Sequence, residues 1–157
     1  RDGRDANQHH DSHGGEPMSE QPTFDSITVG FELPALVKQP TTRQLVQYAG
    51  ASGDFYEIHY DQDFARAQSL PGVIIHGALK SAWVAQAVTD WMGPAGTLQA
   101  FSVRYRDMDV PGDTLTCTAT VVEKDDALGT VRCEIALTNG AGDVTTTGDA
   151  TVQLPRS

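Results

Sequence analysis

The chain has 157 residues, enough for one domain with a substantial core; 39% of the residues are hydrophobic and 20% are charged. Its formal net charge is −10 and it carries no basic block, so electrostatics disfavour nucleic acid as a partner. No run approaches the roughly 20 apolar residues that a membrane-spanning helix requires, so no membrane partner is expected.

Residues 1–22 are polar and show no apolar periodicity. We predict a disordered tail or a remnant foreign to the natural chain, followed by one domain over residues 23–157. His9, His10 and His13 could hold a metal weakly, but solvated tail histidines are the simpler interpretation. No secretory signal is evident, so the cytoplasm is the expected location.

The first part of the domain predicts one strand and two short helices. A lead-in and first strand are expected over residues 24–33, interrupted by Pro34 and Pro40. Thr41 or Thr42 can then cap a helix that ends between residues 50 and 53. A second helical piece is expected over residues 61–68.

The longest apolar helical pattern runs from Gly77 to Met92 and is stopped by Gly93-Pro94. Such a helix would be about 24 Å long. Leu79, Trp83 and Ala87 recur at four-residue steps, and small alanines lie beside them. A helix this apolar must be wrapped by other elements rather than rest on a surface.

After residue 100 the apolar period changes from 3.6 to 2. Alternating segments cover residues 101–105, 115–121, 131–137 and 144–154, and Asn139-Gly140 is a strong hairpin signal. We predict about four sequential antiparallel strands forming a meander with one buried face. One long helix followed by such a sheet indicates an α+β fold in which the sheet curls around the helix.

Two cysteines, Cys117 and Cys133, fall on the apolar phase of neighbouring segments. Neither has a nearby His or Cys at metal-ligand spacing, so we expect reduced thiols in the core.

Polar chemistry gathers at the entry to the long helix. Asp54 and His59 are five positions apart, and His76 and Gly77 follow where the helix begins. Taken singly, Asp54 could be a turn residue and His59 a structural histidine. Together, an acid and an imidazole beside a buried helix are the groups from which a general acid–base site could be built.

A longer motif surrounds these residues. The run Tyr48-Ala49-x-x-Ser52-Gly53-Asp54-x-x-x-Ile58-His59-x-Asp61, followed by Ile75-His76-Gly77-x-Leu79, resembles the hydratase motif of MaoC-like (R)-specific enoyl-CoA hydratases. The resemblance extends over residues 24–154 and implies the hot-dog fold, an antiparallel sheet wrapped around one long central helix. It also implies a hydro-lyase that interconverts trans-2-enoyl-CoA and (3R)-3-hydroxyacyl-CoA without a metal or redox cofactor.

One departure from the family pattern concerns the substrate range. The family usually has Asn-Pro between the catalytic acid and the histidine, where this chain has Tyr56-Glu57. This variant is similar to the small subunits of heteromeric, actinobacterial steroid side-chain enoyl-CoA hydratases. Tyr56 would add bulk near the pocket, and the missing Asn removes an amide that could orient neighbouring groups.

The resemblance gives each candidate residue a role. Asp54 and His59 would be catalytic and hold one water, while the Gly77 N–H, supported by the helix dipole, would face the thioester oxygen. His76 would lie beside that oxygen or serve a structural role. The possible pocket or CoA contacts are Tyr56, Trp83 and Arg104, with the alternatives that Trp83 is core and that Arg104 is a strand-surface or subunit contact.

Assembly and alternative functions follow from the same resemblance. Exposed edge strands favour a dimer with a continuous sheet, either a homodimer or a heteromer with a second MaoC-like chain. One alternative is a subunit that binds or shapes the acyl pocket without independent activity. Another is a hot-dog acyl-CoA thioesterase, which would not need the acid–imidazole pair.

Overall fold

The computed structural model describes residues 21–157. The predicted tail therefore lies outside the described residues except for Gln21 and Pro22, and so do His9, His10 and His13. The Gln21 side chain donates to the Met92 carbonyl at 2.7 Å, so the described part of the chain begins against the end of the long helix.

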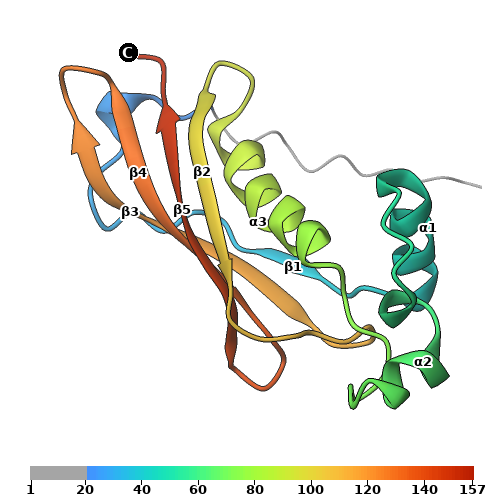
Figure 1. Cartoon of the computed structure of the whole chain (residues 1–157). Helices are drawn as coiled ribbons and strands as arrows, with labels where there is room; N and C mark the ends of the chain where they lie inside the picture. The colour runs from blue at the N-terminus through green and yellow to red at the C-terminus, as the bar shows by residue number, and fades with distance from the viewer. Residues whose placement is uncertain (1–20) are drawn as a thin grey trace, which may run out of the picture.

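Five antiparallel strands form one sheet in the order β1-β3-β4-β5-β2. The strands are β1 (Leu36–Lys38), β2 (Thr97–Tyr105), β3 (Leu115–Asp125), β4 (Thr130–Thr138) and β5 (Val144–Gln153). The helices are α1 (Thr42–Ser52), α2 (Gln62–Ala67) and α3 (Gly77–Met92), with 3₁₀ turns η1 (Phe24–Ser26) and η2 (Glu57–His59). In Figure 1 the sheet curls along α3, while α1 and α2 lie together beyond its N-terminal end.

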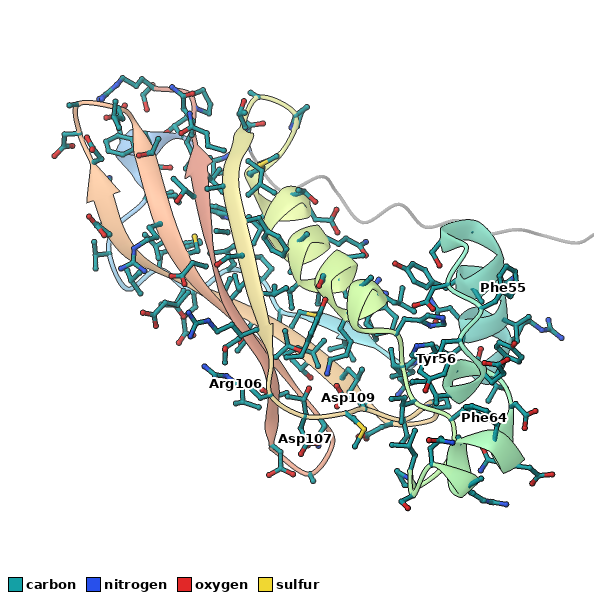
Figure 2. The ribbon with its side chains drawn as sticks, viewed as in Figure 1. Phe55, Tyr56, Phe64, Arg106, Asp107 and Asp109 are labelled. Carbon is teal, nitrogen blue, oxygen red and sulfur yellow. The ribbon has the colours of Figure 1, made fainter. Side chains whose placement is uncertain are left out.

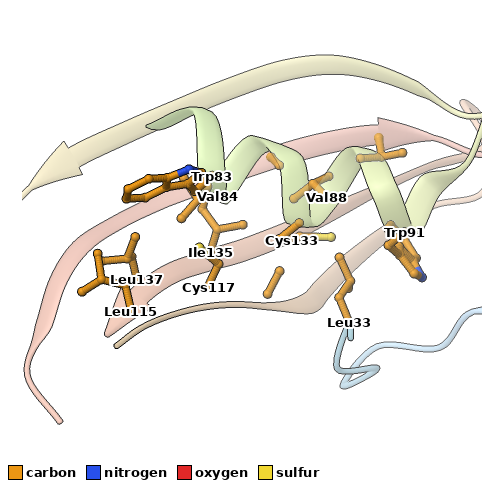
Figure 3. Packing of buried hydrophobic residues seen from close by; sticks show 14 of the residues in the cluster. Leu33, Trp83, Val84, Val88, Trp91, Leu115, Cys117, Cys133, Ile135 and Leu137 are labelled. Carbon is orange, nitrogen blue, oxygen red and sulfur yellow. The ribbon is translucent and has the colours of Figure 1, made fainter. Parts of the chain in front are cut away.

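Helix α3 is the centre of the hydrophobic core. It contacts all five strands, and Leu79, Trp83 and Ala87 are buried as predicted. Figure 3 shows Trp83, Val84 and other α3 side chains packed against apolar side chains of the sheet. The helix begins and ends at the predicted residues. It ends there because Gly93 adopts a positive φ of 65° and Pro94 cannot continue the hydrogen-bond ladder. Among residues 21–157, no helix is both long and apolar enough to cross a membrane.

The predicted alternation of the strands is confirmed along β3 and β4. The apolar residues of these strands face the core and are nearly or fully buried: Leu115, Cys117, Ala119, Val121, Val131, Cys133, Ile135 and Leu137. Both cysteines are free, and burial raises the pKa of each thiol to about 11. They are core residues with little thiolate character near neutral pH.

The predicted lead-in and first strand over residues 24–33 are only partly correct, because residues 30–33 bond to β3 around an isolated bridge at Glu32 but do not form a strand of their own. Residues 24–26 form the turn η1, closed by a hydrogen bond from Thr23 N to Ser26 Oγ, and the first strand of the sheet is β1 instead. Phe24, Ile27 and Leu33 are buried, so their apolar side chains fill the core from an irregular backbone. The apolar pattern reported burial correctly but not strand geometry.

The predicted meander is correct only for β3, β4 and β5. Strand β2 pairs with β5 instead of with β3, because the sheet closes around α3 and brings β2 beside the last strand. Val144, expected on the buried face, is exposed. A register shift lies between Leu137 and Thr138, and Thr145 and Thr146 are buried in its place.

The two short helices begin and end at local signals. The Thr41 hydroxyl accepts from Gln44 N to cap α1, and Gly53 ends this helix in the left-handed region with φ of 76°. Asp61 caps α2 by accepting from the backbone N–H groups of Asp63 and Phe64. These boundaries leave Asp54 and His59 on the short connection between α1 and α2.

Candidate active site

Asp54 stands directly after the left-handed Gly53. Its backbone N–H donates to Ser52 Oγ at 3.2 Å, and its Oδ1 accepts from Tyr56 N at 3.4 Å. The side chain remains 48% exposed. The turn therefore fixes the carboxylate but leaves it accessible, as a group that acts on a small molecule must be.

His59 ends the turn η2 and is held from one side of its ring. Its Nδ1 lies 2.7 Å from the carbonyl of Ile74. A carbonyl only accepts, so Nδ1 carries the hydrogen and the neutral ring presents a lone pair at Nε2. Nε2 lies 3.8 Å from Asp54 Oδ2, beyond direct hydrogen-bond range. The two acceptors thus face each other across a gap that one water can bridge.

His76 lies directly behind His59. Its ring stacks on the His59 ring with centroids 3.8 Å apart, and its Nε2 donates to the Asp54 carbonyl at 3.2 Å. Burial lowers the pKa of His76, and neighbouring His59 lowers it further, although Asp54 opposes this. Among the groups of residues 21–157, His76 Nδ1 is buried without a hydrogen-bond partner. A neutral His76 therefore links the loop of Asp54 to the ring of His59.

Gly77 is the first residue of α3, where the backbone N–H has no partner within the helix. A side chain at this position would meet the ring of Tyr105, whose Cζ lies 3.0 Å from the place of a Cβ. The Tyr105 hydroxyl lies 2.5 Å from Ser81 Oγ, so the ring is pinned against the helix start. The glycine thus lets β2 approach the helix end closely.

The remaining candidates lie at different distances from this cluster. The Tyr56 ring packs edge-on against both His59 and Phe64, so Tyr56 borders the cluster. Figure 2 shows Tyr56 and Phe64 in this part of the molecule. Trp83 is buried in the core on α3. Arg104 lines a depression of about 580 Å³ on the sheet face that carries Arg106 and Glu134, and is not brought together with Asp54 and His59. Its CoA contact stays a prediction.

The same cluster contains the donor set that could hold a metal. One ligand atom each from Asp54, His59 and His76 lies within 4.8 Å of the others. The rings of His59 and His76 already bond carbonyls through Nδ1 and Nε2 respectively, which orients their lone pairs.

Sequence reasoning missed several groups that position these side chains. The Ile74 carbonyl sets the tautomer of His59, but a backbone contact leaves no residue-type signal. Tyr48 packs edge-on against His76 with centroids 4.9 Å apart, and its place in the quoted motif was the available signal. The Ser81–Tyr105 contact joins residues far apart in the chain, so no local sequence pattern predicts it.

The fold and this cluster define the class of protein. Residues 18–140 match the MaoC-like domain family, so the chain belongs to that family. Its fold is the hot-dog fold, with the sheet wrapped around α3.

Three relatives, described next, match most of the length of this chain. The beta subunit of 3-oxo-4,17-pregnadiene-20-carboxyl-CoA hydratase from Mycobacterium tuberculosis is 32% identical over 126 residues, which are 80% of this chain and 94% of the relative. R-hydratase PhaJ1 from Pseudomonas aeruginosa superposes with a TM-score of 0.78 at 26% identity, covering 86% of each chain. A chain of the ChsH1–ChsH2 complex from Mycobacterium tuberculosis gives a TM-score of 0.74 at 26% identity, covering 81% of this chain and 98% of that one.

Proposed function

We propose that this protein adds water to the double bond of a trans-2-enoyl-CoA and forms the (3R)-3-hydroxyacyl-CoA, or catalyses the reverse reaction. The observation that carries the proposal is the pair of acceptors, Asp54 Oδ2 and His59 Nε2, 3.8 Å apart. The relatives named above are a CoA-thioester hydratase subunit and an R-hydratase, which supports this reaction class.

In the addition, a water donates one hydrogen to each acceptor and turns its oxygen towards C3 of the enoyl group. The C3–O bond forms as one O–H bond breaks, and the Asp54–His59 pair takes the proton. That proton then passes to C2, so the reaction balances without another reactant. Because one set of groups handles both oxygen and proton, addition occurs on one face. Positioned acid–base groups of this kind contribute about 10²–10⁴-fold in rate.

Negative charge develops on the thioester oxygen while C3 is attacked. The Gly77 N–H, which has no partner within the helix, and the positive end of the α3 dipole are suited to stabilise it. A donor of this kind is worth about 3–4 kcal/mol in other acyl-transfer sites. Tyr56, whose ring lies against His59, would then limit the shape of the acyl group.

The test is hydration of short, long and steroid-like enoyl-CoA substrates, with chiral analysis of the product. D54N keeps the size of Asp54 and removes its charge, so it should nearly abolish the reaction while circular dichroism stays unchanged. E57Q is the matched control, because Glu57 is exposed and its carboxylate makes no hydrogen bond or ion pair within residues 21–157. Full activity in D54N, or an (S) product, would contradict the proposal. Release of free thiol instead of hydration would identify a thioesterase.

A second MaoC-like chain as partner is the related proposal. Strand β2 is an edge of the sheet, paired only with β5 among the described strands. The aromatic residues beside the site, Phe55, Tyr56 and Tyr60, are exposed. One relative is named as a beta subunit and one solved structure is a complex of two chains, which supports a heteromer.

Native mass measurement of the chain alone and mixed with a candidate MaoC-like partner tests this assembly. Activity that appears only in the mixture, and is lost with D54N in this chain, would show a heteromeric enzyme that uses this site. Activity in the mixture that survives D54N would mean that this chain shapes the pocket without catalysing. The buried, reduced thiols are in keeping with the cytoplasm, which remains the predicted location.

A further inference from the structure

A buried ion pair lies next to the candidate site but outside it. Lys80, on the first turn of α3, places its Nζ 2.5 Å from Asp109 Oδ2. The lysine side chain is 2% exposed and the aspartate side chain is fully buried. Figure 2 shows Asp107 and Asp109 on the segment that follows β2, near the N-terminal end of α3.

Further polar groups complete the cluster. Thr145 on β5 donates from Oγ1 to Asp109 Oδ2 at 2.6 Å, and Lys80 Nζ also donates to the Asp107 carbonyl at 2.8 Å. Asp109 Oδ1 is buried and has no partner among the groups of residues 21–157. The ion pair thus ties three parts of the fold together: the start of α3, strand β5 and the segment after β2.

Stability alone does not explain such a pair. Removing two charges from water costs several kcal/mol per ion, and apolar replacements of buried pairs are often neutral or stabilising. A buried pair fixes geometry, however, because breaking it leaves an uncompensated charge. The question is therefore which geometry this pair holds.

The backbone contacts of Asp109 show which geometry the ion pair holds. Its carbonyl accepts from Ile75 N at 2.8 Å. The preceding residue, Ile74, offers the carbonyl that accepts from His59 Nδ1, and its own N–H donates to the Ile58 carbonyl at 3.0 Å. The Ile74 carbonyl and the Ile75 N–H belong to one planar peptide group, so the peptide group that orients the catalytic imidazole is the same one that Asp109 holds.

We propose that Lys80, Asp109 and Thr145 are positioning residues that hold the segment from Ile74 to Gly77 in register, and through it the His59 ring and the Gly77 N–H. This inference rests on the proposed function, since it assigns the cluster to the same reaction. None of the three residues touches the substrate; each acts through the backbone of residues 74–77. Loosening the cluster misplaces both the imidazole and the amide.

The decisive variant replaces the whole pair by apolar residues, K80M/D109L. It should fold, because no unpaired charge remains, yet its kcat should fall about 10- to 100-fold with little change in KM, since a displacement of about 1 Å near the reacting atoms can cost about 10²-fold. The matched control is E123L/R132M, which removes an exposed pair 3.1 Å apart on β3 and β4 and should leave kcat unchanged.

A readout independent of activity is the nitrogen NMR spectrum of the histidine side chains. The wild-type protein should show His59 with its hydrogen on Nδ1, and K80M/D109L should show a mixture of tautomers and a changed pH titration of that ring. A wild-type protein that hydrates nothing, either alone or mixed with a MaoC-like partner, would defeat the proposed function, while the tautomer comparison would still test the positioning role. K80M/D109L with wild-type kcat and wild-type His59 tautomer would overturn the inference.

T145V keeps the inference testable if the double variant does not fold. It preserves the shape of the side chain and removes one hydrogen bond to Asp109. We expect a smaller loss of kcat in the same direction and a shifted pH profile of kcat/KM. A T145V protein that matches the wild type in both measurements would contradict the positioning role of the cluster.

Discussion

The close approach of Tyr105 to the start of α3 makes Gly77→Ala an informative perturbation. The added Cβ would lie 3.0, 3.1 and 3.4 Å from three carbons of the Tyr105 ring. Ordinary carbon contacts lie at about 3.5–4.0 Å, so the ring must retreat by roughly 0.5 Å. Since its hydroxyl is held by Ser81 at 2.5 Å, this movement strains or breaks that hydrogen bond.

The expected effect on stability is small because two terms oppose each other. A lost hydrogen bond costs about 0.5–1.5 kcal/mol, while replacing glycine by alanine in a helix gains about 0.5–1 kcal/mol. The free energy of unfolding should therefore change by less than about 1 kcal/mol. The backbone N–H is still present in the variant, but the methyl group and the displaced ring crowd its approach. We expect kcat/KM for enoyl-CoA hydration to fall about 10- to 100-fold.

The assay compares kcat/KM and urea unfolding of G77A, Y105F and G77A/Y105A. Y105F keeps the ring and removes only the Ser81 contact, so it should retain most activity. G77A/Y105A removes the collision and should recover much of the activity lost in G77A. Wild-type kcat/KM in G77A, or a double variant no better than G77A, would refute the reasoning about this contact.

Three further outcomes follow from buried groups. Between pH 9 and 11 the free energy of unfolding should fall, because the thiols of Cys117 and Cys133 have a pKa near 9.0 in the unfolded chain and near 11 in the folded one. The slope should reach about 1.4 kcal/mol per pH unit for each thiol. Urea unfolding of C117A/C133A over the same pH range should show a flatter profile. Below pH 6.5 stability should also fall, because the unfolded chain protonates His76 while burial lowers the folded pKa, and H76F should reduce this loss. Gly148→Ala should destabilise the fold by about 1–3 kcal/mol or more, since the added methyl group collides with the Ser102 carbonyl of β2. An unchanged thermal unfolding temperature would contradict that packing.

Local patterns predicted the elements whose signals lie within them. The bounds of α3 followed from its apolar run and from Gly93-Pro94, and the buried faces of β3 and β4 followed from strict alternation. Asp54, His59 and His76, which lie together in the fold, were predicted as a group because they belong to one motif of two runs between residues 48 and 79.

Long-range pairing accounts for what the sequence left unresolved. The position of β2 beside β5 depends on how the whole sheet closes around α3, and short-range turn signals do not encode this. Nothing in the local sequence pairs Lys80 with Asp109, and only the fold brings the two side chains together. The first strand was misplaced because burial of Phe24 and Leu33 is compatible with an irregular backbone as well as with a strand.

The central claim is that Asp54 and His59 act as one unit on a single water. A double-mutant cycle of D54N, H59Q and D54N/H59Q, measured as kcat/KM for enoyl-CoA hydration, tests it most directly. We predict that each single variant loses about 10²–10⁴-fold and that the double variant is no slower than the worse single one. Losses that multiply, or a single variant with wild-type activity, would show that the two residues do not share that water.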